Sequence, residues 1–94
     1  MKKKTLIRRE VRQSGGEVYE YELFVRKSEE MASFHLPLYS VGIKLTEDGE
    51  RTGNALIDDA FSSAEKAICF FNGLVESLTP PSSLAFLLDE ALSN

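Results

Sequence analysis

Residues 62–78 read SSAEKAICFFNGLVESL and form the one long segment that is apolar enough to cover a β-sheet. Its apolar residues recur at steps of three and four, which places them on one face of an α-helix. The spacing of Ser62 and Glu65 is that of a capping box, so we expect the helix to begin at Ser62. We expect it to end near Leu78, with more than half of its surface covered. The residues of the apolar face are Ala64, Ala67, Ile68, Phe71, Leu74, Val75 and Leu78.

The segments before this helix have the alternation of β-strands. Tyr19, Tyr21, Leu23 and Val25 alternate with charged residues, and Tyr39, Val41, Ile43 and Leu45 alternate with small or polar ones. The second pattern predicts a sheet with one face open to water, which is typical of antiparallel sheets. A first strand over residues 3–12 has no clean apolar face; its alternation groups Thr5, Ile7, Arg9 and Val11. A fourth strand is expected over residues 51–57. It directs toward the core either Ala55 and Ile57 or, on the other face, Leu56.

Glycines mark two tight turns, Gly15-Gly16 and Asp48-Gly49, both typical of hairpins. After the first helix, Thr79 suits an N-cap and Pro80 the first position of a second helix that runs to about Leu92. We expect Leu84, Leu87, Leu88, Ala91 and Leu92 to form its packed side. The sequence therefore predicts an α+β fold: a four-stranded antiparallel β-meander followed by two C-terminal helices packed on one face, in the order ββββαα.

Length and composition indicate one soluble domain over residues 1–94. The chain is 43% hydrophobic and 28% charged, both ordinary values for a globular domain. Neither a membrane-spanning segment nor the apolar core of a signal peptide is found, so we expect a cytoplasmic protein. The single cysteine, Cys69, excludes an intrachain disulfide, and its place in an apolar helix predicts an inert buried thiol.

Charge is distributed unevenly along the chain. Residues 1–12 carry a balance of +5 and residues 13–94 a balance of −9, which together give the net charge of −4. Such a basic arm could bind nucleic acid or an acidic partner. It could also pair with Glu17, Glu20 and Glu22 of the next strand, which is the interpretation that we favour. We do not expect nucleic-acid binding, because the rest of the chain is acidic.

Residues 28–38 have no clear period and are unusually apolar for a loop. Pro37 cannot donate a ladder hydrogen bond, which disfavours a central strand there. The loop either packs on the body, the interpretation that we favour, or binds a partner. In the second case the binding residues are Met31, Phe34, His35 and Leu36.

Residues for catalysis, metal binding or cofactor binding do not form a recognisable pattern. His35 is the only histidine, and together with Cys69 it has no zinc-ligand spacing. Asp58 and Asp59 are adjacent on a strand, so their carboxylates should point to opposite faces and not act as a pair. We therefore expect no enzyme, no metal site and no cofactor.

Three short motifs resemble a known protein family. They are YELFV at residues 21–25, YSVGIK at residues 39–44, and Thr79-Pro80 followed by Leu84 and by LDEAL at residues 88–92. In these three motifs the chain is similar to a family of small uncharacterised proteins of Firmicute bacteria. That family is known only as a domain of unknown function. The resemblance covers about residues 19–92 and departs at Pro81 and in the loop over residues 28–38. It implies a bacterial cytosolic protein and transfers no activity and no catalytic residues.

Three functions are compatible with these observations. We expect a non-enzymatic protein-interaction or regulatory module that binds a protein partner or forms a homodimer, through a sheet edge or the loop over residues 28–38. One alternative is a nucleic-acid-associated regulator that uses the basic amino-terminal residues. The other is a small-molecule-binding domain with a pocket between helix and sheet, lined by Tyr19, Tyr21 and Tyr39.

Overall fold

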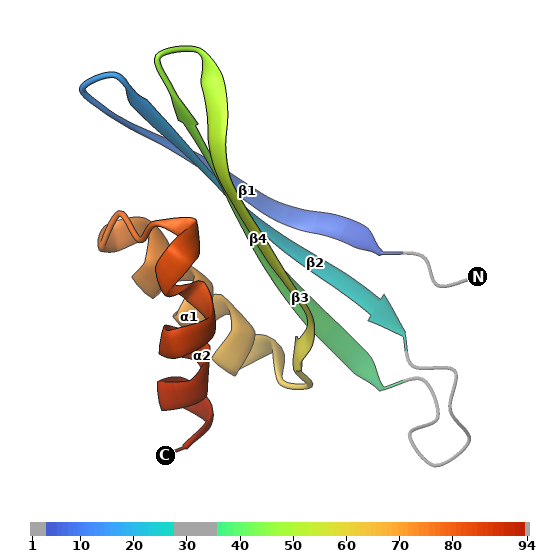
Figure 1. Cartoon of the computed structure of the whole chain (residues 1–94). Helices are drawn as coiled ribbons and strands as arrows, with labels where there is room; N and C mark the ends of the chain where they lie inside the picture. Colours follow the sequence, from blue (N-terminus) through green and yellow to red (C-terminus); the bar gives the residue numbers. More distant parts are fainter. Residues whose placement is uncertain (1–3, 28–35, 94) are drawn as a thin grey trace.

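A computed structural model describes residues 4–27 and 36–93 of the chain. Its elements are β1 (Thr5–Ser14), β2 (Glu17–Lys27), β3 (Pro37–Glu47), β4 (Glu50–Phe61), α1 (Ala64–Glu76), a 3₁₀ turn η1 (Pro81–Ser83) and α2 (Leu84–Leu92). The four strands form one antiparallel sheet in the order β1-β2-β3-β4. Both helices lie on the same side of this sheet (Figure 1). The predicted α+β fold and its ββββαα order are confirmed.

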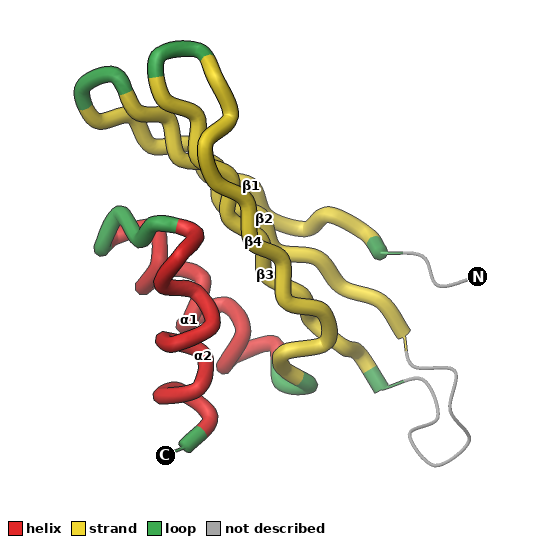
Figure 2. Tube along the Cα trace, in the orientation of Figure 1, coloured by secondary structure: helices red, strands yellow, loops and turns green. Residues whose placement is uncertain are grey.

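Two tight hairpin turns lie side by side at one end of the sheet (Figure 2). Gly15 has a φ of 60°, and Asp48 and Gly49 have φ values of 50° and 86°, the left-handed conformations that such turns require. The backbone N–H of Asp48 donates to the carbonyl of Gly16 over 3.0 Å, so the two tips are joined. Both turns lie at the predicted glycines.

The core lies between the sheet and the helices, where the alternation of β2 and β3 placed it. The buried apolar residues are Tyr19, Tyr21, Leu23, Tyr39, Val41, Ile43, Phe61, Ala67, Phe71, Leu74, Leu84 and Leu88. In β4, Ala55 and Ile57 pack against this core whereas Leu56 is exposed, which decides between the two faces that the sequence allowed.

The opposite face of the sheet is less open to water than the sequence predicted. Gly42 is buried, and a Cβ there would lie 3.4 Å from the Leu56 side chain and 4.0 Å from Phe24. Ser40 is only 1% exposed, and its hydroxyl accepts a hydrogen bond from the Asp59 N–H over 3.0 Å. Large side chains from the neighbouring strands therefore cover the small residues of β3.

Helix α1 begins one residue later than predicted. Its N-cap is Ser63, whose hydroxyl accepts from the Lys66 N–H over 3.3 Å, so the capping box of Ser62 and Glu65 is wrong. The reason is Phe61, which is still part of β4 and is buried in the core. The chain needs one more residue to leave the sheet before it can turn into the helix.

The end of α1 is a Schellman motif built without glycine. Leu78 has a φ of 51°, the Thr79 N–H donates to the Leu74 carbonyl over 3.1 Å, and the Leu78 N–H donates to the Val75 carbonyl over 3.3 Å. Helix α1 thus ends at Glu76, two residues before the predicted end. Thr79 is then buried and is not the N-cap of a second helix.

The two prolines delay the second helix. A residue that precedes proline avoids the helical region, so Pro80, which precedes Pro81, is extended with a ψ of 158°. Pro81 instead opens the turn η1, and α2 starts only at Leu84. The prediction of Thr79 as N-cap and Pro80 as first helical residue is therefore wrong.

The helices are covered less completely than predicted. Seven of the thirteen residues of α1 are exposed, so less than half of this helix is covered. In α2, Leu84 and Leu88 are buried and Leu87 is half-buried, but Ala91 and Leu92 are exposed although we expected them on the packed side. The last turn of α2 therefore extends beyond the core.

Candidate interaction surface

Strand β1 is a long edge strand that no other element covers. All ten of its residues are exposed, and they include Leu6, Ile7 and Val11 at 45%, 43% and 48%. An exposed edge with apolar side chains is a template on which another extended chain can pair. In the strand order β1-β2-β3-β4, β1 and β4 are the two edges of the sheet, and β1 is exposed along its whole length.

A β-bulge at Ile7 explains why the first strand has no clean alternation. Leu6 pairs with Phe24 and Arg8 with Leu23, so Ile7 is an extra residue without a partner. Beyond the bulge, Arg8 to Ser14 pair regularly with Leu23 to Glu17. The predicted grouping of Thr5 with Arg9 and Val11 is wrong, because the bulge reverses the faces after Leu6.

The regular part of β1 has two distinct faces. Residues opposite each other in an antiparallel pair share a face. Arg8, Glu10 and Arg12 lie opposite Leu23, Tyr21 and Tyr19, and so they lie on the helix side of the sheet. Arg9, Val11 and Gln13 lie opposite Glu22, Glu20 and Val18, on the other side.

The hairpin also fixes which backbone groups of β1 are free. Ser14 and Glu17 flank the two-residue turn, so they form a hydrogen-bonded pair. Hydrogen-bonded and non-hydrogen-bonded pairs alternate along an antiparallel ladder. Consequently the N–H and C=O groups of Arg9, Val11 and Gln13 point away from β2, toward the open edge.

Most cations of β1 already have partners within the chain. Arg9 forms an ion pair with Glu20 of β2, and Lys4, just before β1, forms one with Asp58 of β4. Arg12 donates over 2.9 Å to the carbonyl of Val75, one of the last carbonyls of α1, where a cation also suits the helix dipole. The expected pairing of the basic segment with the next strand is confirmed at Arg9.

The loop residues singled out from the sequence are not brought into a site. Met31, Phe34 and His35 lie outside the described residues. Leu36 is described; it is 50% exposed and immediately precedes β3. The proposed role of this loop in partner binding therefore stays a prediction.

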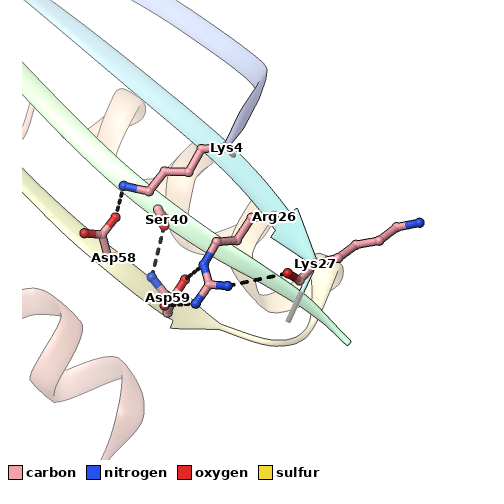
Figure 3. Close-up of polar contacts among 6 residues, drawn as sticks. All are labelled: Lys4, Arg26, Lys27, Ser40, Asp58 and Asp59. Carbon is pink, nitrogen blue, oxygen red and sulfur yellow. Dashed lines mark hydrogen bonds and ion pairs between the residues drawn. The ribbon is translucent and has the colours of Figure 1, made fainter. Parts of the chain in front are cut away.

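A polar cluster joins β2, β3 and β4 near the ends of these strands (Figure 3). Arg26 donates to both carboxylate oxygens of Asp59, over 2.9 and 2.6 Å. Asp59 has a φ of 53° and lies where the β3–β4 register shifts, and Ser40 accepts its N–H. Asp58 pairs with Lys4 instead, so the two adjacent carboxylates do not act together. The cluster stabilises a bulge, and its buried Ser40 hydroxyl offers nothing to a substrate.

A shallow apolar cleft separates the two helices. One part, of about 410 Å³, is lined by residues that include Phe70, Leu74 and Leu87, and an adjoining part of about 390 Å³ includes Phe61 and Leu92. Cys69 lines both parts and its thiol is exposed, so the prediction of a buried thiol is wrong. Cys69 lies at the edge of the apolar stripe of α1, where it lines the cleft and is not covered by α2.

The three tyrosines form part of the core and do not line these two cavities. The Tyr19 and Tyr21 rings stack with centroids 6.3 Å apart. The Tyr21 hydroxyl donates to the Thr79 carbonyl over 2.9 Å, and burial raises the pKa of Tyr21 to about 12. This arrangement does not favour the tyrosine-lined pocket that the sequence allowed.

In residues 4–27 and 36–93, histidine, cysteine and carboxylate side chains do not gather in groups of three or more that could hold a metal ion. None of the helices described is long and apolar enough to span a membrane. Comparison of the chain with protein-family models, with curated proteins and with solved structures returned no match.

Proposed function

We propose that this protein is a non-enzymatic, cytoplasmic protein-interaction module, and that it binds an extended segment of protein by strand addition to β1. The observation that carries the proposal is the fully exposed edge of β1, on which Arg9, Val11 and Gln13 direct free backbone groups outward. Main-chain hydrogen bonds would supply affinity, and the side chains of Leu6 and Val11 would supply apolar contacts. On the motifs quoted above, we further propose a place in the Firmicute family.

The other edge of the sheet is less suited to strand addition. The β3–β4 register shifts between Tyr39 and Val41 and again between Leu45 and Thr46. Asp59 in β4 also has a left-handed backbone. Such irregularities are a common means of protecting an edge strand. In β1 the one register shift lies at Ile7, and the run from Arg8 to Ser14 pairs without interruption.

Nucleic-acid binding is the weaker candidate for the basic segment. Arg9 and Lys4 are paired with carboxylates of the same chain, and Arg12 caps α1. Phosphate contacts would have to break these interactions. The apolar residues of β1 also have no role in binding a phosphate backbone, whereas strand addition uses them.

The experiment compares partner capture by the wild type with capture by two variants of Val11. Val11→Pro removes an N–H that points to the open edge, and so it should leave the pairing of β1 with β2 intact. Val11→Thr keeps that N–H and the β-branched shape. Tagged proteins are used to capture partners, with and without nuclease treatment, from lysate that also contains untagged copies of this chain.

We expect a stoichiometric partner, whether a different protein or the untagged chain, that Val11→Thr retains and Val11→Pro loses. Circular dichroism of both variants checks that the fold is unchanged. Capture that is equal in all three proteins would refute binding at this edge. Capture that disappears with nuclease would instead support the nucleic-acid alternative.

A further inference from the structure

We infer that the strand added to β1 is β1 of a second copy of this chain, in an antiparallel pair with Val11 opposite its own symmetry mate. This inference rests on the proposed function, since it names the partner of the same edge. It follows from the charges and hydrogen-bonding directions of β1, which permit few registers and favour one of them.

The backbone restricts the possible registers. Only Arg9, Val11 and Gln13 of the regular run point their N–H and C=O groups to the open edge. In a symmetric antiparallel pair, each of these outward-pointing residues must lie opposite an outward-pointing residue of the other copy. The twofold axis then passes through one residue position of the run, and each position makes a different set of cross-strand pairs.

Charge discriminates among these registers. An axis at Arg8, Arg9 or Arg12 places two guanidinium groups opposite each other, and an axis at Glu10 places two carboxylates together. Like charges directly opposite are destabilising. An axis at Gln13 or Ser14 brings the glycine turn into the pair and shortens it. The remaining register, with its axis at Val11, avoids these problems.

In the Val11 register the pairs are complementary. Val11 lies opposite Val11 of the other copy, and Glu10 lies opposite Arg12 on both sides of the axis. Arg9 lies opposite Gln13, and Arg8 opposite Ser14, so the pair uses the regular run from its first residue to its last. The Glu10–Arg12 pairs are non-hydrogen-bonded, the positions at which opposite Cα atoms come closest, at about 4.5 Å.

The positive charge of β1 does not oppose this association strongly. Lys4 lies outside the paired run and is neutralised by Asp58, and Arg9 is neutralised by Glu20. Within the run, Arg8 and Arg12 have no ion pair among the described residues; Arg12 donates to the Val75 carbonyl and, in this register, lies opposite Glu10 of the other copy. The resulting dimer has one continuous sheet to which each copy contributes four strands, with the helices of both copies on the same face. The same patch serves both copies, which closes the assembly at two.

The test measures the dimer dissociation constant by sedimentation equilibrium between about 1 and 200 μM, since a pair of short strands is a small interface. Glu10→Arg turns two attractive pairs into two repulsive ones and should weaken the dimer about thirtyfold. Arg12→Glu should weaken it similarly. The double variant Glu10→Arg/Arg12→Glu restores opposite charges and should recover most of the affinity, although it loses the contact of Arg12 with Val75. Recovery in the double variant separates pairing from a structural role of either residue.

Disulfide trapping tests the register. In a Cys69→Ser background, Val11→Cys should oxidise to a covalent dimer, because opposite Cα atoms in a hydrogen-bonded pair lie about 5.5 Å apart, within the range for a disulfide. Gln13→Cys lies opposite Arg9 in this register, and so it should not cross-link to itself. Efficient cross-linking of Gln13→Cys, but not of Val11→Cys, would overturn the register.

A wild type that stays monomeric over the whole concentration range would overturn the self-pairing. A dimer that Glu10→Arg and Val11→Pro both leave unchanged would overturn it as well, because the contact would then lie elsewhere. The proposed function, strand addition to β1, is refuted by a different result from the one that refutes self-pairing. It survives a monomeric wild type if a different protein is captured through β1, and it fails if Val11→Pro changes neither capture nor self-association.

Discussion

Tyr21→Phe removes one oxygen atom from the most buried polar contact between the sheet and the helical layer. Tyr21 is 0% exposed, and its hydroxyl donates to the carbonyl of Thr79 over 2.9 Å. Thr79 belongs to the Schellman motif that ends α1, and it is itself buried. The substitution keeps the ring and its stacking on Tyr19, and so it isolates the hydrogen bond.

The expected cost follows from this burial. A hydrogen bond contributes about 1 kcal/mol net, and a buried carbonyl left without its donor costs about 1–3 kcal/mol. We therefore expect Tyr21→Phe to lower the free energy of unfolding by about 2 kcal/mol, measured by urea denaturation. The control is Tyr39→Phe, because Tyr39 is also buried but its hydroxyl makes no hydrogen bond to the part of the chain that is described. It should cost less than about 0.5 kcal/mol.

The Tyr21 hydroxyl should also make the free energy of unfolding depend on pH. Burial raises the pKa of Tyr21 to about 12, from the ordinary tyrosine value of 10.0 that applies in the unfolded chain. Below pH 10 both states hold the proton, so the pH has no effect through this group. Above pH 10 the unfolded state loses its proton first, and stability falls until the folded pKa is reached. Tyr21→Phe should flatten this decline. A loss below about 0.5 kcal/mol together with an unchanged decline would refute the role given to this hydroxyl.

Two further substitutions test the faces of β3. Ile43→Ala truncates a fully buried side chain and should cost about 2–5 kcal/mol, whereas Lys44→Ala, on the opposite face, should cost less than about 1 kcal/mol; similar losses of melting temperature would contradict the assignment. Ser40→Ala removes the acceptor of the Asp59 N–H at the β4 bulge and should cost about 1–2 kcal/mol, measured by urea denaturation. An unchanged midpoint of urea denaturation would mean that water replaces the Ser40 hydroxyl as acceptor of the Asp59 N–H.

The sequence predicted the regular elements because their patterns are set by burial. The alternation of Tyr21 and Leu23 in β2, and of Val41 and Ile43 in β3, identifies the core face. The glycines at positions 15 and 49 identify the turns because they adopt left-handed backbone conformations. These local signals were sufficient for the fold class and the order of the elements.

Features that depend on neighbouring strands could not be predicted. The bulge at Ile7 depends on the pairing with β2, so the alternation of β1 alone gave the wrong faces. Ser40 looked like a surface residue because its acceptor role depends on a bulge in β4. A local rule was also overlooked: Pro81 restricts Pro80, and this signal could have shown that the second helix starts late.

The candidate surface was predicted only in part. A sheet edge was one of the two surfaces expected, but the sequence did not indicate which strand would form an unprotected edge. The decisive information is the strand order and the register, which place β1 outside and direct the backbone of Val11 outward.

Amide hydrogen exchange, followed residue by residue by NMR, tests the central claim that β1 pairs with an added strand. In a dilute sample the amides of Arg9, Val11 and Gln13 should exchange rapidly, while that of Glu10, which is bonded to β2, should be protected. At concentrations at which the protein is associated, or with a captured partner bound, the first three amides should become protected. If they continue to exchange rapidly in the associated state, strand addition at β1 is contradicted.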